Sequence, residues 1–257
     1  WGDGKTNRSL RKKGREVAYF MIVNTRPASL SENINLLARD QMLNIKTIHL
    51  SVLEPNESSL DNQRFDLYVG KISAYKNIIF TSQSAVKFGS KILNLRDLSK
   101  VFDGEVYSIG PATSLELQKI GINPVVAQSH NSEGLLGTIK NKVGRSLLFC
   151  GKNSRGYLKD NLTNLDVIDC YDLVFNASEL NQLDESDEII LVYNFKTLDF
   201  IVSSLDIEIL NSKVFIVASN RILEQLKESR KNIKGLKVYV ADEPSDLQML
   251  KKASSFI

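Results

Sequence analysis

Three observations predict an α/β protein with two five-stranded parallel sheets, each flanked by helices. Apolar runs of at most seven residues recur about every 20–30 residues along the chain. These runs are continuous rather than alternating, as expected of strands that are covered on both faces. Helical patterns separate them, and strand–helix alternation is typical of parallel sheets. Ten strands exceed one ordinary doubly wound sheet in 257 residues, so we expect two sheets.

The strand candidates are rich in β-branched and aromatic residues, which favour extended backbone. In chain order they are VAYFMIV (17–23), IKTIHL (45–50), NIIFTS (77–82), EVYSIG (105–110), PVVAQ (124–128), SLLFCG (146–151), DVIDCY (166–171), EIILVY (188–193), KVFIVA (213–218) and KVYVA (237–241). The segments Ser51–Asn56, which contains Pro55, and Asp169–Asp172 are interpreted as crossings between the domains.

The clearest helix candidates place apolar residues on one face, and most have a capping residue at one end. Ser29 or Ser31 caps a helix with Leu30, Ile34, Leu37, Ala38 and Met42; residues 112–120 carry Leu115, Leu117 and Ile120 before Gly121; a helix opening at Ser132 carries Leu135, Leu136 and Ile139; residues 221–229 carry Ile222, Leu223 and Leu226.

The composition is that of an ordinary soluble globular protein, with 42% hydrophobic and 25% charged residues. Two cysteines, Cys150 and Cys170, exclude a disulfide scaffold and are interpreted as packing residues with free thiols, which fits a reducing cytoplasm. Two histidines, His49 and His130, are too few for a His-rich metal centre. No apolar run approaches the roughly 18–20 residues of a membrane span, so no membrane is expected as a partner.

The basic character of the chain comes from its first residues. Residues 1–16 carry six Lys or Arg against two acidic residues, a sum of +4, whereas the whole chain carries +3. The remainder therefore sums to −1, and we expect a disordered, solvated tail over 1–16 and no nucleic-acid partner. The tail and VAYFMIV (17–23) together resemble a signal peptide, but seven apolar residues without a cleavage site fit a buried first strand better.

Hydroxyl, amide and arginine side chains follow six of the predicted strands. The carboxyl ends of parallel strands form the ligand crevice of α/β sheets, so these residues are candidate ligands for a large polyanion. Any one of them alone is better explained as a helix cap, and the inference depends on the coincidence of six such strand ends. The six segments are Thr25–Arg26, Thr81–Ser84, Gly110–Thr113, Gly151–Arg155, Asn194–Thr197 and Ser219–Arg221.

Several familiar catalytic patterns are missing from the chain. It contains no Gly-x-Gly-x-x-Gly or Walker loop, which argues against a nucleotide-dependent enzyme, and no Gly-x-Ser-x-Gly elbow. The acidic run Asp184–Glu188 is interpreted as a solvated loop rather than a metal site. Tyr171 follows the apolar run 165–170 at the expected crossing between the domains, and a phenol with a pKa of about 10 can donate a hydrogen bond or a proton at neutral pH. The alternative is that Tyr171 only packs.

Taken in chain order, the segments at these strand ends resemble the motifs of the uroporphyrinogen-III synthase family. The resemblance covers about residues 17–256, and its strength lies in the ordered series rather than in any one motif. Two departures are Asn194, where a serine is common, and VASNRILEQL (217–226), which is similar to the bacterial Ser-x-Arg variant. The matching segments are Thr25-Arg26-Pro27, IIFTSQSAV (78–86), YSIGPATSLELQKIG (107–121), PVVAQSHNSEGLL (124–136), LLFCGKNSRGYLKDNL (147–162) and VIDCYDLV (167–174).

The resemblance implies a discontinuous first domain, residues 17–50 with 173–257, and an inserted second domain, residues 53–168. A two-strand linker joins them, and the family's active site lies in the cleft between. It also implies a role in chemistry for Tyr171. The implied substrate-binding residues are Thr25, Arg26, Thr81, Ser82, Gln83, Ser84, Gly110, Pro111, Ala112, Thr113, Ser132, Gly151, Arg155, Asn194, Lys196, Ser219 and Arg221.

The implied activity is that of a cyclising lyase, which closes hydroxymethylbilane to uroporphyrinogen III with loss of water and inversion of ring D. The resemblance implies that no cofactor or metal is needed. We expect a cytoplasmic monomer that can contact the preceding pathway enzyme transiently. The alternative is a non-catalytic module of the same fold that binds a tetrapyrrole or another polyanion. Isomer analysis of the product separates the two, because a binding module would leave the spontaneous isomer ratio unchanged.

Overall fold

The computed structural model describes residues 20–56, 71–93, 97–152, 154–184, 187–230 and 235–257. These described residues form two compact units: unit 1 lies within 20–50 and 177–257, and unit 2 lies within 51–176. The tail predicted over 1–16 lies outside the described residues, as does the start of the first predicted strand. No helix among the described residues is long and apolar enough to cross a membrane.

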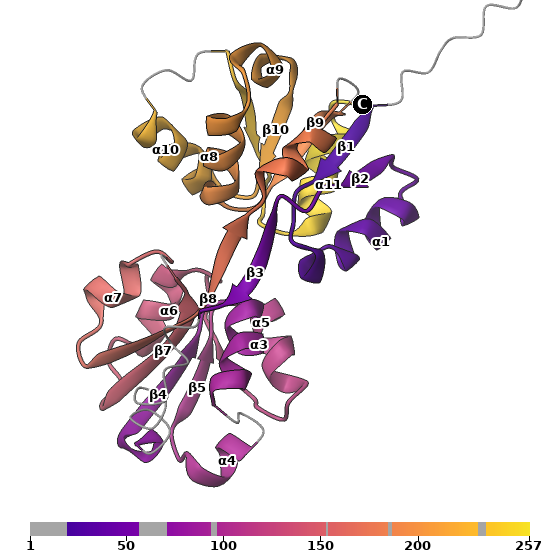
Figure 1. The fold of residues 1–257 in the computed structure, drawn as a ribbon. Coiled ribbons are helices and arrows are strands. Elements are labelled where there is room, and N and C mark those ends of the chain that lie inside the picture. The colour runs from indigo at the N-terminus through magenta and orange to yellow at the C-terminus, as the bar shows by residue number, and fades with distance from the viewer. Residues whose placement is uncertain (1–19, 57–70, 94–96, 153, 185–186, 231–234) are drawn as a thin grey trace, which may run out of the picture. The chain divides into compact units, whose positions relative to one another are not determined.

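Unit 1 contains a parallel sheet of five strands in the order β11-β10-β9-β1-β2. Helices α8 and α10 pack against each other, as do α1 and α11, and the two pairs cover opposite faces of the sheet (Figure 1). The elements are β1 (Met21–Asn24), η1 (Ala28–Leu30), α1 (Glu32–Asp40), β2 (Ile45–Thr47), η5 (Ala177–Gln182), β9 (Asp187–Val192), α8 (Phe195–Ser204), α9 (Ile207–Ser212), β10 (Val214–Val217), α10 (Asn220–Ser229), β11 (Lys237–Val240) and α11 (Asp246–Ser254).

Unit 2 contains a sheet of six strands in the order β3-β8-β7-β4-β5-β6. Strand β3 runs antiparallel to β8, and the other neighbours are parallel. The elements are β3 (Ser51–Pro55), η3 (Ile72–Ala74), β4 (Tyr75–Phe80), α3 (Gln83–Ile92), α4 (Leu98–Val101), β5 (Glu105–Ser108), α5 (Pro111–Gln118), β6 (Val125–Val126), α6 (Ser132–Ile139), β7 (Arg145–Gly151), α7 (Tyr157–Asn161) and β8 (Leu165–Phe175).

The sequence-based expectation of five parallel strands is wrong for this second sheet. The extra strand is β3, which lies in the segment interpreted as a crossing and whose place in the chain is that of the linker implied by the resemblance; in the structure it is part of the sheet itself. Proline is tolerated there because β3 is an edge strand. The other expected crossing, Asp169–Asp172, lies inside β8, which continues to Phe175 because it pairs with β3 from Tyr171 onward.

The helices follow the predicted pattern with two exceptions in their apolar faces. Ile34 and Ala38 of α1, Leu135 and Ile139 of α6, and Ile222 and Leu226 of α10 are buried, as expected. Gly121 ends the α5 segment with a φ of 83°, a conformation that favours glycine. Met42, however, lies beyond the end of α1 and is 93% exposed, and Leu115 of α5 is also exposed.

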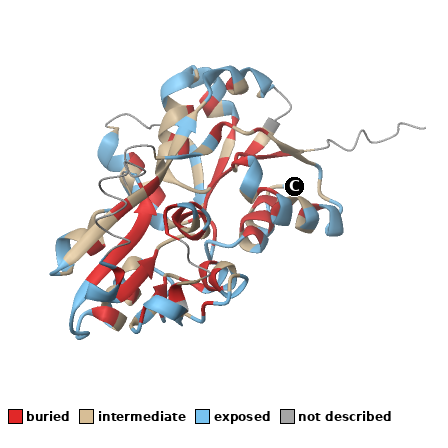
Figure 2. Ribbon diagram, turned by 60° about the horizontal axis from the view of Figure 1, so that its bottom comes forward, coloured by how far each residue is buried: buried red, intermediate tan, exposed pale blue. Residues whose placement is uncertain are grey.

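Apolar clusters fill both units, and the strands carry most of the buried residues while the outer helix faces are exposed (Figure 2). In unit 2 the two faces of the sheet pack against separate clusters. Cys170 belongs to one cluster and Cys150 to the other. Both thiols are buried, and burial raises the pKa of each to about 12.

We therefore expect both cysteines to resist alkylation in the folded protein. At pH 8 a thiol with this pKa is ionised in roughly one molecule in 10⁴, whereas an unfolded cysteine has a pKa of about 8.5. Iodoacetamide at pH 8 followed by mass spectrometry should find no label on the native chain and two labels on the urea-unfolded chain. Rapid labelling of the native protein at either residue would contradict the described packing.

Candidate active site

The predicted site residues gather at two sheet edges. Strands β1, β9 and β10 end together at the carboxyl edge of the sheet in unit 1, and β4, β5 and β7 end together in unit 2. The first edge carries Thr25, Arg26, Asn194, Lys196, Ser219 and Arg221; the second carries Thr81, Ser82, Gln83, Ser84, Gly110, Pro111, Ala112, Thr113, Gly151 and Arg155.

Tyr171 of β8 lies at the second edge, where its hydroxyl oxygen is 3.0 Å from Ser82 Oγ. The same Ser82 oxygen accepts a hydrogen bond from Ala85 N at 3.0 Å and so caps α3. The Tyr171 ring stacks on Phe88, with ring centroids 5.6 Å apart. Burial raises the pKa of Tyr171, and the hydrogen bond with Ser82 only partly opposes that rise. The phenol is therefore fixed in place and protonated at neutral pH.

Gly151 makes room for this phenol. It stands opposite Tyr171 in the ladder between β7 and β8. A Cβ added at Gly151 would lie 2.8 Å from Tyr171 Cζ and 3.0 Å from its hydroxyl oxygen, closer than such contacts ordinarily allow. The glycine is thus a packing requirement of the tyrosine rather than a source of side-chain chemistry.

The other predicted residues of unit 2 differ in whether their side chains are already hydrogen-bonded or buried. Thr81 Oγ1 donates to Phe149 O at 3.3 Å, and Ser84 and Thr113 are buried in the first turns of α3 and α5. Gly110 begins α5 without any side-chain cap, and the next two residues, Pro111 and Ala112, are exposed. Gln83 is half-buried as the first residue of α3.

Ser132 and Arg155 lie beside a second helix start. Ser132 is the first residue of α6, but the cap is its neighbour Asn131, whose Oδ1 accepts from Gly134 N at 2.8 Å. The exposed Arg155 forms an ion pair with Glu133 and lies over the Tyr157 ring at 4.4 Å. Its charge is therefore partly balanced within the unit.

The predicted residues of unit 1 also differ in whether their side chains already have partners within the protein. Thr25 is buried, and its Oγ1 donates to Leu191 O at 2.7 Å. Asn194 caps α8 by accepting from Thr197 N at 2.9 Å. Ser219 precedes α10 without a side-chain cap bond, Arg221 is exposed on its first turn, and Lys196 is half-buried in α8.

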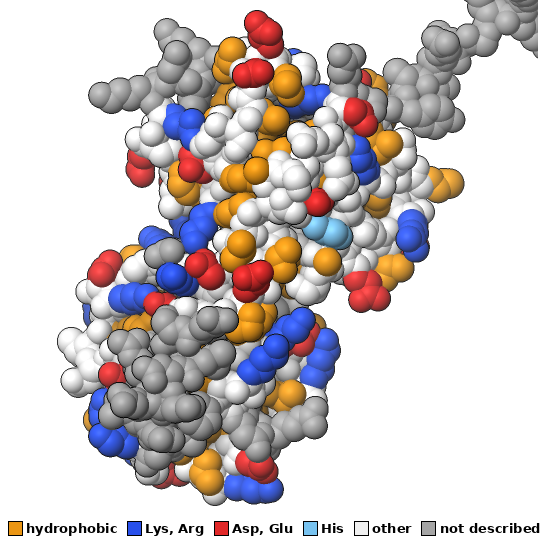
Figure 3. Space-filling model, in the orientation of Figure 1, with side chains coloured by type: hydrophobic (Ala, Val, Ile, Leu, Met, Phe, Trp, Pro, Cys, Tyr) orange, Lys and Arg blue, Asp and Glu red, His pale blue; other side chains and the backbone are white. Residues whose placement is uncertain are grey.

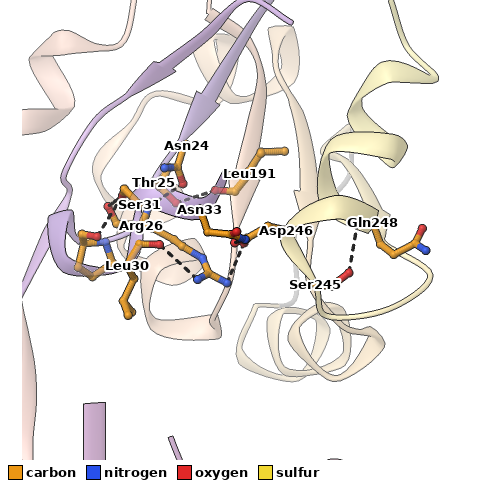
Figure 4. A network of polar contacts seen from close by, with 11 residues as sticks. Asn24, Thr25, Arg26, Leu30, Ser31, Asn33, Leu191, Ser245, Asp246 and Gln248 are labelled. Carbon is orange, nitrogen blue, oxygen red and sulfur yellow. Dashed lines mark hydrogen bonds and ion pairs between the residues drawn. The ribbon is translucent and has the colours of Figure 1, made fainter. Parts of the chain in front are cut away.

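Arg26 is held in a polar network inside unit 1 (Figure 4). Its Nη2 atom lies 3.1 Å from Asp246 Oδ1, and its guanidinium carbon lies 3.8 Å from the centre of the Tyr193 ring. Neither Asp246 nor Tyr193 is among the residues predicted from the sequence. A signal for Asp246 exists, because Ser245-Asp246 follows the last strand and is typical of a helix start.

The described residues contain no group of three or more His, Cys, Asp or Glu that could hold a metal ion. His49 Nδ1 lies 3.0 Å from Arg26 O, and His130 is exposed with a φ of 49°. The two edges thus offer backbone N–H groups at helix N-termini, hydroxyl groups, a few cations and the phenols of Tyr171 and Tyr193. These groups suit the binding of carboxylates and a hydrogen bond to a leaving oxygen.

A family model and several solved structures resemble this chain. A family model described as uroporphyrinogen-III synthase HemD matches residues 35–251. A uroporphyrinogen-III synthetase from Helicobacter pylori has a similar structure, with a TM-score of 0.62 at 18% identity, covering 92% of this chain and 99% of that one. A mutant uroporphyrinogen III synthase from the extremely thermophilic bacterium Thermus thermophilus gives a TM-score of 0.59 at 12% identity, covering 91% and 97%. No curated protein matches the chain by sequence.

The packing of Gly151 against Tyr171 predicts that Gly151→Ala is destabilising. The added methyl group must displace the ring from Ser82, at a cost of about 1–3 kcal/mol in the free energy of unfolding. Urea unfolding measures this cost. The matched control is Gly137→Ala in α6, where an added Cβ meets nothing within 4 Å and should stabilise the helix. Equal stability of Gly151→Ala and wild type would show that the phenol is not held in this position.

Proposed function

The chain belongs to the uroporphyrinogen-III synthase family, and from this premise we propose how its residues carry out the reaction. The protein is a cyclising lyase of tetrapyrrole biosynthesis. Its reaction closes hydroxymethylbilane, a linear tetrapyrrole with carboxylates on every ring, into uroporphyrinogen III. The terminal hydroxyl group leaves, and ring D attacks through its substituted carbon to give a spiro intermediate. This intermediate fragments at the bond between ring D and its original methylene bridge and then recloses with ring D inverted. The protein must therefore hold a flexible polyanion in one conformation and assist the loss of hydroxide.

We propose that carboxylates of the substrate bind at the carboxyl edges of the two sheets. Backbone N–H groups in the first turn of a helix are unsatisfied unless a side chain caps them, and the helix dipole favours an anion there. Ser82 and Asn194 already cap α3 and α8. Gly110 and Ser219 make no side-chain cap bond to α5 and α10. The starts of α5 and α10 are therefore our first candidates for carboxylate binding.

Tyr171 carries the chemical part of the proposal. Its hydroxyl group stands at the same edge as α5, fixed by Ser82 and Phe88. The raised pKa keeps the phenol protonated, so it can donate a hydrogen bond to the terminal hydroxyl group of the substrate as the C–O bond breaks. The departing hydroxide takes the proton of the phenol and leaves as water, and the proton that ring D loses on closure returns to the Tyr171 oxygen.

The direct test of the function is turnover of hydroxymethylbilane with separation of the product isomers. We expect uroporphyrinogen III as the main product, whereas spontaneous closure gives the non-inverted isomer. A product ratio equal to that of the protein-free reaction would instead identify a binding module without catalysis. A monomeric state and a transient contact with the preceding enzyme stay predictions, and sedimentation with and without that enzyme can check both. The cytoplasmic location also stays a prediction.

Tyr171→Phe should lower kcat by at least about tenfold, because it removes the donor while preserving the ring stacked on Phe88. The melting temperature should change little. Up to about pH 9 the wild-type kcat should show no alkaline loss from this group, since a phenol with a raised pKa still holds its proton there. The matched control is Tyr239→Phe, at a half-exposed ring on β11. Wild-type turnover by Tyr171→Phe would remove the phenol from the mechanism.

A further inference from the structure

Arg26 joins three parts of unit 1 that are far apart in the sequence: its own segment after β1, Tyr193 and Asp246. Its Nη1 donates to Leu30 O at 3.4 Å, at the end of η1. Its Nη2 faces Asp246 Oδ1 on the first residue of α11 at 3.1 Å. Its guanidinium plane lies over Tyr193, the residue that follows β9, at 3.8 Å. Figure 4 shows the side chain reaching from the end of β1 toward α11.

The backbone of Arg26 is held as firmly as its side chain. Its N–H donates to Asn24 Oδ1 at 3.1 Å. Its carbonyl oxygen accepts from Ser31 Oγ at 3.1 Å and lies 3.0 Å from His49 Nδ1. Asn24 in turn donates to Thr47 Oγ1 at 3.4 Å, which connects the end of β1 with β2. The conformation of the segment after β1 is therefore fixed from several directions.

Asp246 is the buried partner of this network, with 8% of its surface exposed. Its second oxygen, Oδ2, accepts from Asn33 Nδ2 on α1 at 2.7 Å. The first turn of α11 further favours a negative charge. A substrate carboxylate that captured Arg26 would have to take its guanidinium from Asp246 and leave that carboxylate buried without its cation. Such a loss is costly because the carboxylate is desolvated.

We propose that Arg26 and Asp246 are positioning residues of the synthase rather than ligands of its substrate. The pair fixes the turn after β1 and, through the Tyr193 ring, the Tyr193–Asn194 junction that begins α8. It thereby sets the shape of the carboxyl edge of this sheet. The inference rests on the proposed function, in which that edge binds substrate carboxylates.

A double-mutant cycle tests the pair in the full-length protein. Arg26→Ala, Asp246→Ala and the double variant are compared with wild type for kcat, KM and melting temperature, all assayed well below the lowest melting point. We expect each single variant to lose at least about tenfold in kcat/KM and the double variant to lose no more than the worse single variant. The melting temperatures should be non-additive in the same way.

Two results would overturn the proposal. If Arg26 binds substrate directly, Arg26→Ala raises KM while Asp246→Ala leaves KM unchanged or lowers it, because the cation is released for the substrate. If the pair only stabilises the fold, the melting temperature falls while kcat/KM stays at the wild-type value. Arg26→Lys and Asp246→Asn form a second cycle with the same criteria should the alanine variants fail to fold.

The matched control is Arg230→Ala, which breaks the pair between Arg230 and Asp199, 2.8 Å apart in the same unit. Arg230 lies at the end of α10 remote from its first turn, so this variant should lower the melting temperature without changing kcat/KM. An inactive wild-type protein would refute the proposed function. The pairing itself would then be judged by whether the unfolding free energies of the Arg26 and Asp246 variants are non-additive; additivity would overturn it.

Discussion

The common direction of the strands is the constraint on which the rest of this structure depends. Continuous apolar strands require cover on both faces, and helical crossovers that provide this cover return each strand in the same direction. The strand ends and the N-termini of the following helices therefore meet at one edge of each sheet. The strands that end at such an edge are β4, β5 and β7 in unit 2 and, in the separate sheet of unit 1, β1, β9 and β10. The polar residues there owe their proximity to the buried apolar runs that precede them.

Several polar groups at these edges already have partners within the protein. Ser82 and Asn194 satisfy their own helices, and Thr25 donates to a neighbouring strand. Arg26 is committed to Asp246. These groups make the edges rigid, while the starts of α5 and α10 lack side-chain caps. Figure 3 shows Lys and Arg side chains together with acidic and hydrophobic side chains on the face of the molecule that it presents.

Local sequence patterns predicted much of the fold, because each apolar run of the analysis corresponds to a strand among the described residues. They missed β3, whose extended form depends on pairing with β8, more than a hundred residues away in sequence. Local patterns could not predict the ion pair between Arg26 and Asp246 either, because Asp246 lies near the other end of the chain. The sequence could place polar residues at strand ends; it could not tell a cap from a free donor, because that distinction depends on side-chain geometry across the sheet.

The central claim is that a phenol fixed by the sheet edge assists the loss of hydroxide from the substrate. The most direct test is the single-turnover rate of uroporphyrinogen III formation in wild type, Tyr171→Phe, Ser82→Ala and the double variant. If Ser82 acts by orienting the Tyr171 hydroxyl group, Ser82→Ala slows the wild-type protein several-fold and leaves the rate of Tyr171→Phe unchanged. An unchanged rate in Tyr171→Phe, or equal slowing by Ser82→Ala in both backgrounds, would contradict the account.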